Sequence, residues 1–435
     1  MSGVNRDNGP VRVLALSSPI YAHTLNAAPF LRGLAERGAE VHWGVATPWA
    51  DGVTAGAEVW DTGPVLSFSH RGGRIRDVSA RFDWLLADAA VRVRAVQRVI
   101  DEVEPDIVLT DSLGYAAALA SERLGLPWVT FGDGPLHYPD PLTPPFGAGL
   151  PYRTMRPWVW RNAVVQTVSR QMVMAAGHRR YDAMRRDLGL PASSAPVLEA
   201  ALSPLLHLHC GAPELEYPRA DLPGHVHFVG ALHPPVRERW EPPTWWRTVV
   251  EDHSGDVVLA TQGTLREDPR EVLRPALDAL LESGRPAVLT TGAADPAALG
   301  GPGLVRRRAG TPVAVESFVP YEKVLPHATA FVTNGGWTGV LLALAHGIPV
   351  LQLGRTEEKA DIGRRVEWAG AGLHLGHARP EPSRLRRALA RFDEDATYRR
   401  GAQRIAASLA TRDPGRDGSD LIYRLMSRQA GTAAG

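Results

Sequence analysis

The chain has little cysteine, no long apolar run and no apolar leader. Cys210 is the one cysteine among 435 residues, so no disulfide can form within the chain, which fits a reducing compartment. The first ten residues are polar and lack the apolar core of a signal peptide. No stretch approaches about 18 consecutive apolar residues, so we expect no integral membrane segment. Together these absences predict a cytoplasmic protein.

The chain also lacks an excess of either charge. Its 48 basic and 47 acidic side chains leave a formal net charge of +1. This balance argues against nucleic acid or an anionic membrane as the main partner. Hydrophobic residues make up 44% and charged residues 22% of the composition, as in globular proteins, and the length exceeds what one core usually serves. We therefore expect two or three domains.

Each half of the sequence alternates strand-like apolar runs with helical patterns. In the first half these runs are residues 11–17, 41–46, 107–110, 128–131 and 205–209. In the second half they are residues 257–261, 287–290, 313–316, 330–333 and 349–353. Such alternation predicts parallel sheets with helices on both faces, and hence an α/β chain of two Rossmann-like halves.

A segment rich in proline and tryptophan, residues 211–246, separates the two halves. Proline density of this kind resists regular structure and suits a connection between domains. We therefore expect a first domain over residues 1–224 and a second over residues 225–435.

The stretch at residues 331–354, FVTNGGWTGVLLALAHGIPVLQLG, reads as a buried strand, a glycine-rich turn, a helix and a second buried strand. The turn is formed by Asn334, Gly335, Gly336, Trp337, Thr338 and Gly339. A helix N-terminus presents unpaired N–H groups and a partial positive charge, and small residues there let an anion approach. The pattern therefore predicts a phosphate site, although an ordinary tight turn has the same spacing.

A histidine and a carboxylate follow two strands of the first half. His23 lies after the first strand, just before a helix that Asn26 would cap, and Asp111 ends another strand. Ligands of open parallel sheets bind beyond the carboxyl ends of the strands, so the two side chains can meet there. The alternative makes His23 a surface residue and Asp111 a helix cap.

At residues 334–372 the sequence resembles the donor-binding signature of family-1 glycosyltransferases, which are nucleotide-sugar-dependent enzymes with a GT-B fold. Gly335, Gly336 and Trp337 match its core, Gly347, Ile348 and Pro349 match its Gly-x-Pro strand, and Glu358 and Lys359 stand where an acidic residue and a glutamine are usual. Asn334 replaces the usual histidine. This variant resembles a bacterial subgroup associated with natural-product or lipid-like acceptors.

The resemblance extends along most of the chain. Residues 259–264 resemble the strand that ends near the donor diphosphate, which implies a role for Thr264. Residues 316–328 resemble the base-binding segment, in which Phe318 would stack on the base and the Val319 backbone would pair with it. Residues 11–41 resemble the opening strand and its loop, so that His23 matches the general base and Asp111 the carboxylate that orients it. Part of the last helical segment, residues 382–429, would cross back and pack on the first domain.

The resemblance implies an inverting, hexosyltransferase-type glycosyltransferase with two parallel sheets facing a central cleft. The sugar would pass from a dTDP- or UDP-sugar to a hydroxyl of a small, apolar natural-product acceptor, as in antibiotic biosynthesis. Backbone N–H groups of residues 335–339, with the Thr338 hydroxyl and Thr264, would stabilise the departing diphosphate. No Asp-x-Asp motif occurs in a convincing context, so no metal or other cofactor is expected.

The acceptor site is less well marked. It would lie in the first domain, where Trp84, Phe131, His137 and Phe146 are candidate linings and the loop at residues 132–151 would cover it. Asn334 offers only neutral donors to a phosphate, which weakens diphosphate binding unless an arginine such as Arg266 or Arg355 compensates. The sequence leaves the choice between monomer and homodimer open.

Two other functions remain open at this point. A UDP-sugar 2-epimerase has the same fold but needs acidic catalytic residues, and the pairing of His23 with Asp111 argues against it. A non-catalytic nucleotide-sugar-binding homologue, acting as partner of an active transferase, gains some support from the substitution at Asn334.

Overall fold

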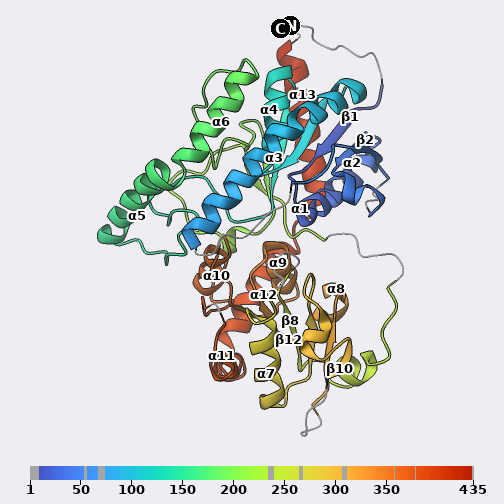
Figure 1. Cartoon of the computed structure of the whole chain (residues 1–435), viewed down its shortest axis with the longest axis vertical. Helices are drawn as coiled ribbons and strands as arrows, with labels where there is room; N and C mark the ends of the chain where they lie inside the picture. Colours follow the sequence, from blue (N-terminus) through green and yellow to red (C-terminus); the bar gives the residue numbers. More distant parts are fainter. Residues whose placement is uncertain are drawn as a thin grey trace.

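The computed structural model describes residues 9–52, 56–66, 74–233, 240–263, 268–305, 311–356, 358–377 and 379–433. Two seven-stranded sheets lie in these residues, and Figure 1 shows them in separate halves of the molecule, each covered by helices. None of the described helices is long and apolar enough to cross a bilayer.

The first sheet has the strand order β3-β2-β1-β4-β5-β6-β7, and its pairings are parallel. Its strands are β1 (Arg12–Leu16), β2 (Glu40–Val45), β3 (Glu58–Asp61), β4 (Ile107–Asp111), β5 (Trp128–Gly132), β6 (His207–His209) and β7 (Val226–Phe228). Its helices are α1 (Tyr21–Asn26), α2 (Ala28–Ala35), α3 (Arg74–Val103), α4 (Tyr115–Leu124), α5 (Arg156–Val168), the π-turn η2 (Ser169–Val173) and α6 (Ala175–Asp187).

The second sheet has the order β10-β11-β9-β8-β12-β13-β14 and is parallel except for the β10–β11 pair. Its strands are β8 (Val257–Thr261), β9 (Ala287–Thr290), β10 (Gly303–Val305), β11 (Val313–Glu316), β12 (Ala328–Thr333), β13 (Val350–Gln352) and β14 (Gly372–His374). Its helices are α7 (Leu273–Ser283), α8 (Tyr321–Val324), α9 (Trp337–Ala345), α10 (Lys359–Trp368), α11 (Pro382–Glu394), α12 (Thr397–Leu409) and α13 (Pro414–Ala433). Shorter turns of helix are η1 (Thr47–Gly52), η3 (Pro213–Leu215), η4 (Arg247–Glu251), η5 (Pro296–Leu299) and η6 (Leu325–His327).

The predicted fold class is confirmed. Every strand-like run named above contains a strand. Helices cover both faces of each sheet, so apolar residues occupy successive positions along most of these strands. In β1, for example, Leu14 and Leu16 join the core on one face, and Val13 and Ala15 join the core on the other.

The first sheet extends beyond the expected boundary between the domains. β7 hydrogen-bonds to β6, so the first sheet continues to Phe228, past the boundary expected after residue 224. The segment is proline-rich, and its three-residue strand is too short to be seen in the sequence pattern. The division of the chain into two domains near this point stays a prediction.

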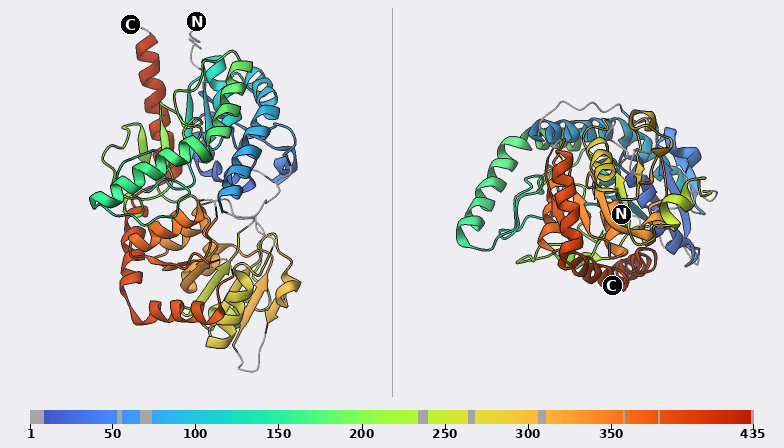
Figure 2. Two further views of the ribbon diagram at one scale, coloured as in Figure 1. Left: turned by 60° about the vertical axis from the view of Figure 1, so that its left-hand side comes forward. Right: turned by 90° about the horizontal axis from the view of Figure 1, so that it is seen from below.

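The last helix returns to the first half of the molecule. Figure 2 shows the red C-terminal helix beside the first half of the molecule. This helix, α13, packs along α2, where Ile422 joins the core around Phe30 and Leu208. The approach is close because glycines face each other: a Cβ on Gly33 would overlap the carbonyl of Gly415. The chain therefore crosses between the two halves twice.

We expect Gly33→Val to destabilise the protein, because the new side chain must displace α13 from α2. Overpacking of this kind typically costs about 1–3 kcal/mol, which lowers the melting temperature by a few degrees. Thermal unfolding measures the effect. Gly224→Val is the matched control, since a Cβ there meets nothing within 4 Å. Equal melting temperatures for the two variants would contradict the close packing of α13.

Candidate active site

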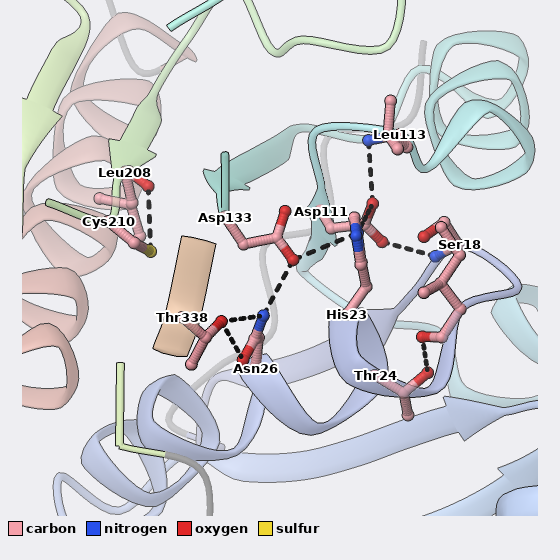
Figure 3. Close-up of polar contacts among 11 residues, drawn as sticks. Ser18, His23, Thr24, Asn26, Asp111, Leu113, Asp133, Leu208, Cys210 and Thr338 are labelled. Atoms are coloured by element: carbon pink, nitrogen blue, oxygen red, sulfur yellow. Dashed lines mark hydrogen bonds and ion pairs between the residues drawn. The ribbon is translucent and has the colours of Figure 1, made fainter. Parts of the chain in front are cut away.

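Three polar side chains meet at the carboxyl ends of neighbouring strands in the first sheet. His23 lies in α1, which follows β1, while Asp111 ends β4 and Asp133 follows β5. Since β1, β4 and β5 are adjacent in the sheet, their carboxyl ends place the three side chains side by side. Figure 3 shows them pointing toward one another.

The imidazole of His23 faces both carboxylates through one nitrogen. Its Nδ1 lies 3.2 Å from Oδ1 of Asp111 and 3.1 Å from Oδ2 of Asp133 (Figure 3). Asp111 is fully buried and is held by the backbone N–H groups of Ser18, at 2.5 Å, and Leu113, at 2.9 Å. The predicted meeting of His23 and Asp111 therefore occurs. Its geometry fixes Nδ1 on the carboxylates and leaves Nε2 for a ligand.

The two carboxylates control the protonation of His23. Burial alone lowers the pKa of His23, but the charges of Asp133 and Asp111 outweigh burial and raise the pKa to about 9. Burial raises the pKa of Asp133 to about 6, against the opposing effect of His23. The pKa of Asp111 falls below its usual value, because its hydrogen bonds to His23 and to backbone N–H groups exceed the cost of burial. The cluster thus has one firmly ionised carboxylate and one that titrates more easily.

Asn26 connects this cluster to the second half of the molecule. Its Nδ2 donates to Oδ2 of Asp133 at 3.0 Å and contacts the Thr338 hydroxyl at 3.3 Å, while that hydroxyl lies 3.4 Å from Oδ1 of Asn26 (Figure 3). The prediction that Asn26 caps the next helix is wrong: Ala27 holds that position without a side-chain bond. The amide is used to join the carboxylate cluster to the first turn of α9.

A cavity of about 110 Å³ opens beside His23. Apolar side chains form part of its wall, namely Ile20, Phe82, Leu85, Leu113 and Phe146, and Asp133, His137, Glu358 and Lys359 form polar parts. The Oδ1 atom of Asp133 is buried without a hydrogen-bond partner. The rings of His137 and Phe146 lie 4.3 Å apart, and burial lowers the pKa of His137 to about 4, so this histidine is neutral.

Two of the four predicted acceptor residues lie elsewhere. Phe131 is fully buried and packs on Phe30 with ring centres 5.4 Å apart, because side chains alternate along β5 and this one faces the sheet core. Trp84 donates its indole N–H to the Leu66 carbonyl at 2.7 Å and packs on the core beneath α3. His137 and Phe146 remain as predicted linings, and the side chains of α3 that face the cavity are Arg81, Phe82 and Leu85.

The glycine-rich turn of the second half has the predicted strand–turn–helix form. Gly335 has a φ of 102°, and a Cβ there would overlap the side chain of Gln352, so both conformation and space require glycine. Gly336 precedes α9, and no side chain among the described residues caps the helix, so within this part of the chain its first N–H groups are open to a ligand. Asn334 is nearly buried and its amide donates inward, to the Gln262 carbonyl at 3.4 Å.

Trp337 and Thr338 extend from this turn toward the first half. The Trp337 indole is buried and donates to the Cys210 carbonyl, just after β6, at 2.7 Å. Thr338 bonds to Asn26, so in this structure its hydroxyl is engaged with the first half. A diphosphate at the start of α9 would therefore meet backbone N–H groups beside these two contacts.

The other residues predicted to bind the nucleotide-sugar donor do not gather at a single place. Glu358 and Lys359 line the same cavity as His23, and their charged atoms lie 3.4 Å apart. Lys359 is largely buried, which argues against a solvated charged patch. Phe318, after β11, is about half exposed, as a stacking platform requires, while the Val319 side chain is buried in the core. Thr264 and Arg266 fall outside the described residues, and Arg355 is exposed.

Helix α10 clamps the loop that covers the cavity. Asp361 accepts hydrogen bonds from the backbone N–H groups of Gly147 and of Gly149, the latter at 2.6 Å. One turn further, Arg365 forms a buried ion pair of 2.9 Å with Glu216, whose other oxygen accepts from the Leu136 backbone. The predicted cover, residues 132–151, is thus held directly by Asp361 near its end and, near its start, through Glu216, which pairs with Arg365 of the same helix.

Asp133 and Asn26 are the site residues that sequence reasoning missed. The signal for Asp133 was present, because it follows the predicted strand at residues 128–131 in the same way that Asp111 follows its strand. Asn26 carried no comparable signal, since its partners come from β5 and α9, far away in the sequence.

The side-chain atoms of His23, Asp111 and Asp133 lie within 4.8 Å of one another, close enough to share a cation. A protonated imidazole between the two carboxylates already supplies a positive charge at this point. Only in its neutral form can His23 accept a proton at Nε2 from a group in the cavity, next to a helix N-terminus suited to an anion.

Several known proteins are similar to this chain in sequence or in fold. Residues 307–416 match the family described as Erythromycin biosynthesis protein CIII-like, C-terminal domain. The 4'-demethylrebeccamycin synthase of Lentzea aerocolonigenes is 32% identical over 429 residues, which cover 95% of this chain and 99% of that protein. UDP-glycosyltransferase 2 of Phaeomoniella chlamydospora is 28% identical over 281 residues, covering 64% of this chain and 61% of that protein.

Solved structures show the same architecture. The glycotransferase of kitacinnamycin superposes with a TM-score of 0.71 at 22% identity, covering 96% of this chain and 99% of the other. The glycosyltransferase VinC, solved in complex with dTDP, superposes with a TM-score of 0.68 at 19% identity, covering 96% and 100%. With the near-complete match to a relative at 32% identity, the chain belongs to the family-1 glycosyltransferases of natural-product type, which have the GT-B fold and use nucleotide sugars.

Proposed function

We propose that this enzyme transfers a sugar with inversion from a dTDP-sugar to a hydroxyl of a small, apolar acceptor, with His23 as general base. The observation that carries the proposal is the placement of His23 at a cavity, with Nδ1 fixed on two carboxylates and the open N-terminus of α9 nearby through Asn26 and Thr338.

The proposed step moves one proton and exchanges one bond. An alcohol is a poor nucleophile at neutral pH, so its proton must leave as the new bond forms. Nε2 of His23 takes that proton, the acceptor oxygen bonds to the anomeric carbon, and the bond from that carbon to the diphosphate breaks. Asp111 and Asp133 stabilise the imidazolium that results, and the first N–H groups of α9 stabilise the diphosphate.

The raised pKa of His23 has two effects on this step. It makes the neutral imidazole a stronger base, and it reduces the fraction that is neutral at physiological pH. The rate should therefore rise with pH until His23 has lost its proton. Asp133 titrates at lower pH than His23, so it is ionised throughout this rise.

The donor preference rests on the second half of the molecule. Phe318 is exposed where a base would stack, and α9 begins without a side-chain cap. VinC was solved with dTDP, and so were two other structural neighbours, SsfS6 and the spinosyn rhamnosyltransferase SpnG, with thymidine diphosphate. These neighbours support dTDP over UDP as the nucleotide. Asn334 is turned inward, so the phosphate contacts come from the backbone.

The acceptor proposal rests on the cavity wall. Its apolar residues, from Ile20 to Phe146, suit an apolar ring system, while His23 and Asp133 mark the point where a hydroxyl would lie. The relative named 4'-demethylrebeccamycin synthase supports a natural-product acceptor of this kind.

We expect His23→Ala to lower kcat by about 10²–10⁴-fold, the usual contribution of a positioned base, with little change in donor KM. Asp111→Asn should lower kcat as well, because the imidazolium loses a charged partner. Product formation from a dTDP-hexose is measured by liquid chromatography and mass spectrometry. His178→Ala, at a half-buried histidine of α6, serves as the control. Unchanged transfer by His23→Ala would exclude the general-base role.

Asp133→Asn should move the pH dependence of kcat/KM. Removing this charge lowers the pKa of His23 from about 9 toward its ordinary value of 6.5, so the rising limb of the profile shifts to lower pH. Asp111 still orients the ring, so the variant keeps measurable activity. A profile that drops at every pH without shifting would show that Asp133 does not set the basicity of His23.

We expect dTDP to bind without a metal. At about 100 times its dissociation constant the nucleotide adds about 2.7 kcal/mol to the unfolding free energy, which raises the melting temperature by a few degrees. The shift should be the same with and without excess EDTA, and UDP at equal concentration should give a smaller one. A shift that EDTA abolishes and Mg²⁺ restores would place a cation at the site.

A further inference from the structure

One helix of the acceptor half exposes an apolar stripe. Trp160, Val164, Val168 and Met172 recur at every fourth position along α5 and into η2, and their exposed fractions are 73%, 57%, 46% and 75%. Figures 1 and 2 show α5 projecting sideways from the body of the molecule. Residues at this spacing share one face of a helix, so the stripe is continuous.

The same region carries only positive charge. Residues 141–181 contain no Asp or Glu, and their arginines are Arg153, Arg156, Arg161, Arg170, Arg179 and Arg180. Arg180 pairs with Asp83 of α3, whereas Arg153 and Arg161 lie over the Trp158 ring at 5.6 and 4.8 Å. Among the described side chains, no carboxylate forms an ion pair with Arg153, Arg156 or Arg170. The net charge of +1 for the whole chain conceals this local excess.

An apolar cavity lies between this helix and the loop over the active site. Its volume is about 290 Å³, and its wall consists of Val165, Val168, Val173, Met174 and Leu198 with residues 145–148 of the loop. Val168 belongs both to the exposed stripe and to this cavity. Phe146 belongs both to this cavity and to the one that contains His23. Apolar surface therefore continues from the outer face of α5 to the active site.

We propose that this face, made of Trp160, Val164, Val168 and Met172 with Arg153 and Arg156, binds the surface of an anionic lipid bilayer. The helix has an exposed tryptophan, exposed aliphatic side chains, and arginines that form no ion pair with a described carboxylate, which is the composition of an interfacial helix. At a bilayer, the apolar side chains would enter the acyl boundary and the arginines would contact lipid phosphates. Binding would be peripheral and reversible, since no described helix can cross a bilayer.

A second copy of the chain fits this face less well. A two-fold contact places the same patch on both subunits, so it would bring arginines against arginines with no acid from residues 141–181 to compensate. A lipid surface supplies the missing negative charge. A further consequence rests on the proposed function. An apolar acceptor dissolved in the bilayer would enter the cavity beside α5 and reach His23 past Phe146.

Vesicle co-sedimentation tests the proposal with the full chain and without donor or acceptor, so its outcome is independent of catalysis. We expect the protein to sediment with phosphatidylcholine vesicles that contain about one third phosphatidylglycerol, and not with pure phosphatidylcholine. Binding should weaken at about 1 M salt, where the Debye length falls to about 3 Å. Arg153→Glu with Arg156→Glu should weaken it about tenfold or more, since each basic residue near the surface contributes about fivefold.

Two further variants locate the contact. Trp160→Ser with Met172→Ser should also lose binding, because the apolar anchor is removed while the charge is unchanged. Val91→Ser with Arg94→Glu changes an exposed valine and an exposed arginine of α3 in the same way and should bind normally. Melting temperatures verify that each variant is folded.

Three results would overturn the proposal: no binding of the native protein to anionic vesicles, equal loss in the α3 control, or unchanged binding in both α5 variants. Sedimentation velocity without lipid adds a fourth. A dimer that Trp160→Ser with Met172→Ser dissociates would assign the face to a second copy of the chain.

Discussion

The active site depends on two buried carboxylates that share one nitrogen of His23. Burial opposes the ionisation of both carboxylates, and His23 opposes that effect at each of them, so that the pKa of Asp111 falls below its usual value while that of Asp133 rises to about 6. The imidazole in turn gains its basicity from them. Backbone N–H groups of Ser18 and Leu113 fix Asp111, and the Asn26 amide fixes Asp133. Each charge is thus compensated by a group that the strands of the first sheet deliver to the same edge.

Contacts at and around this cluster join the two halves of the molecule. Asn26 reaches Thr338 in the first turn of α9, the Trp337 indole reaches the end of β6, and α10 holds the cover loop through Asp361 and Arg365. The Arg365–Glu216 pair is almost wholly buried, so losing one partner would leave an uncompensated charge. Under the proposed function, donor binding at α9 and acceptor binding beneath the loop would therefore act on contacts made by successive helices of the second half.

Sequence reasoning predicted the parts of the fold and site that depend on local pattern. Apolar strands, the turn at Gly335 and the polar residues at strand ends all have local signals. Their places at strand ends allowed His23 and Asp111 to meet, while their roles as base and orienting carboxylate came from the family resemblance. Residues whose role depends on distant partners were missed or misplaced. Asn26 resembled a cap but bonds across the molecule, and Phe131 resembled a pocket residue although the alternation of β5 turns it inward. The net charge of the whole chain did not reveal the local excess of arginine around α5, because a net charge does not show where along the chain the charges lie.

The most direct test of the account is the titration of His23 itself. Nuclear magnetic resonance of the protein labelled at histidine with ¹⁵N, with the His23 signal assigned by its loss in His23→Gln, gives the pKa of this one side chain. The account predicts a pKa of about 9 in the native protein, because two carboxylates face Nδ1, and a lower value in Asp133→Asn. A native pKa at or below the ordinary 6.5 would contradict it, since burial would then outweigh both carboxylates.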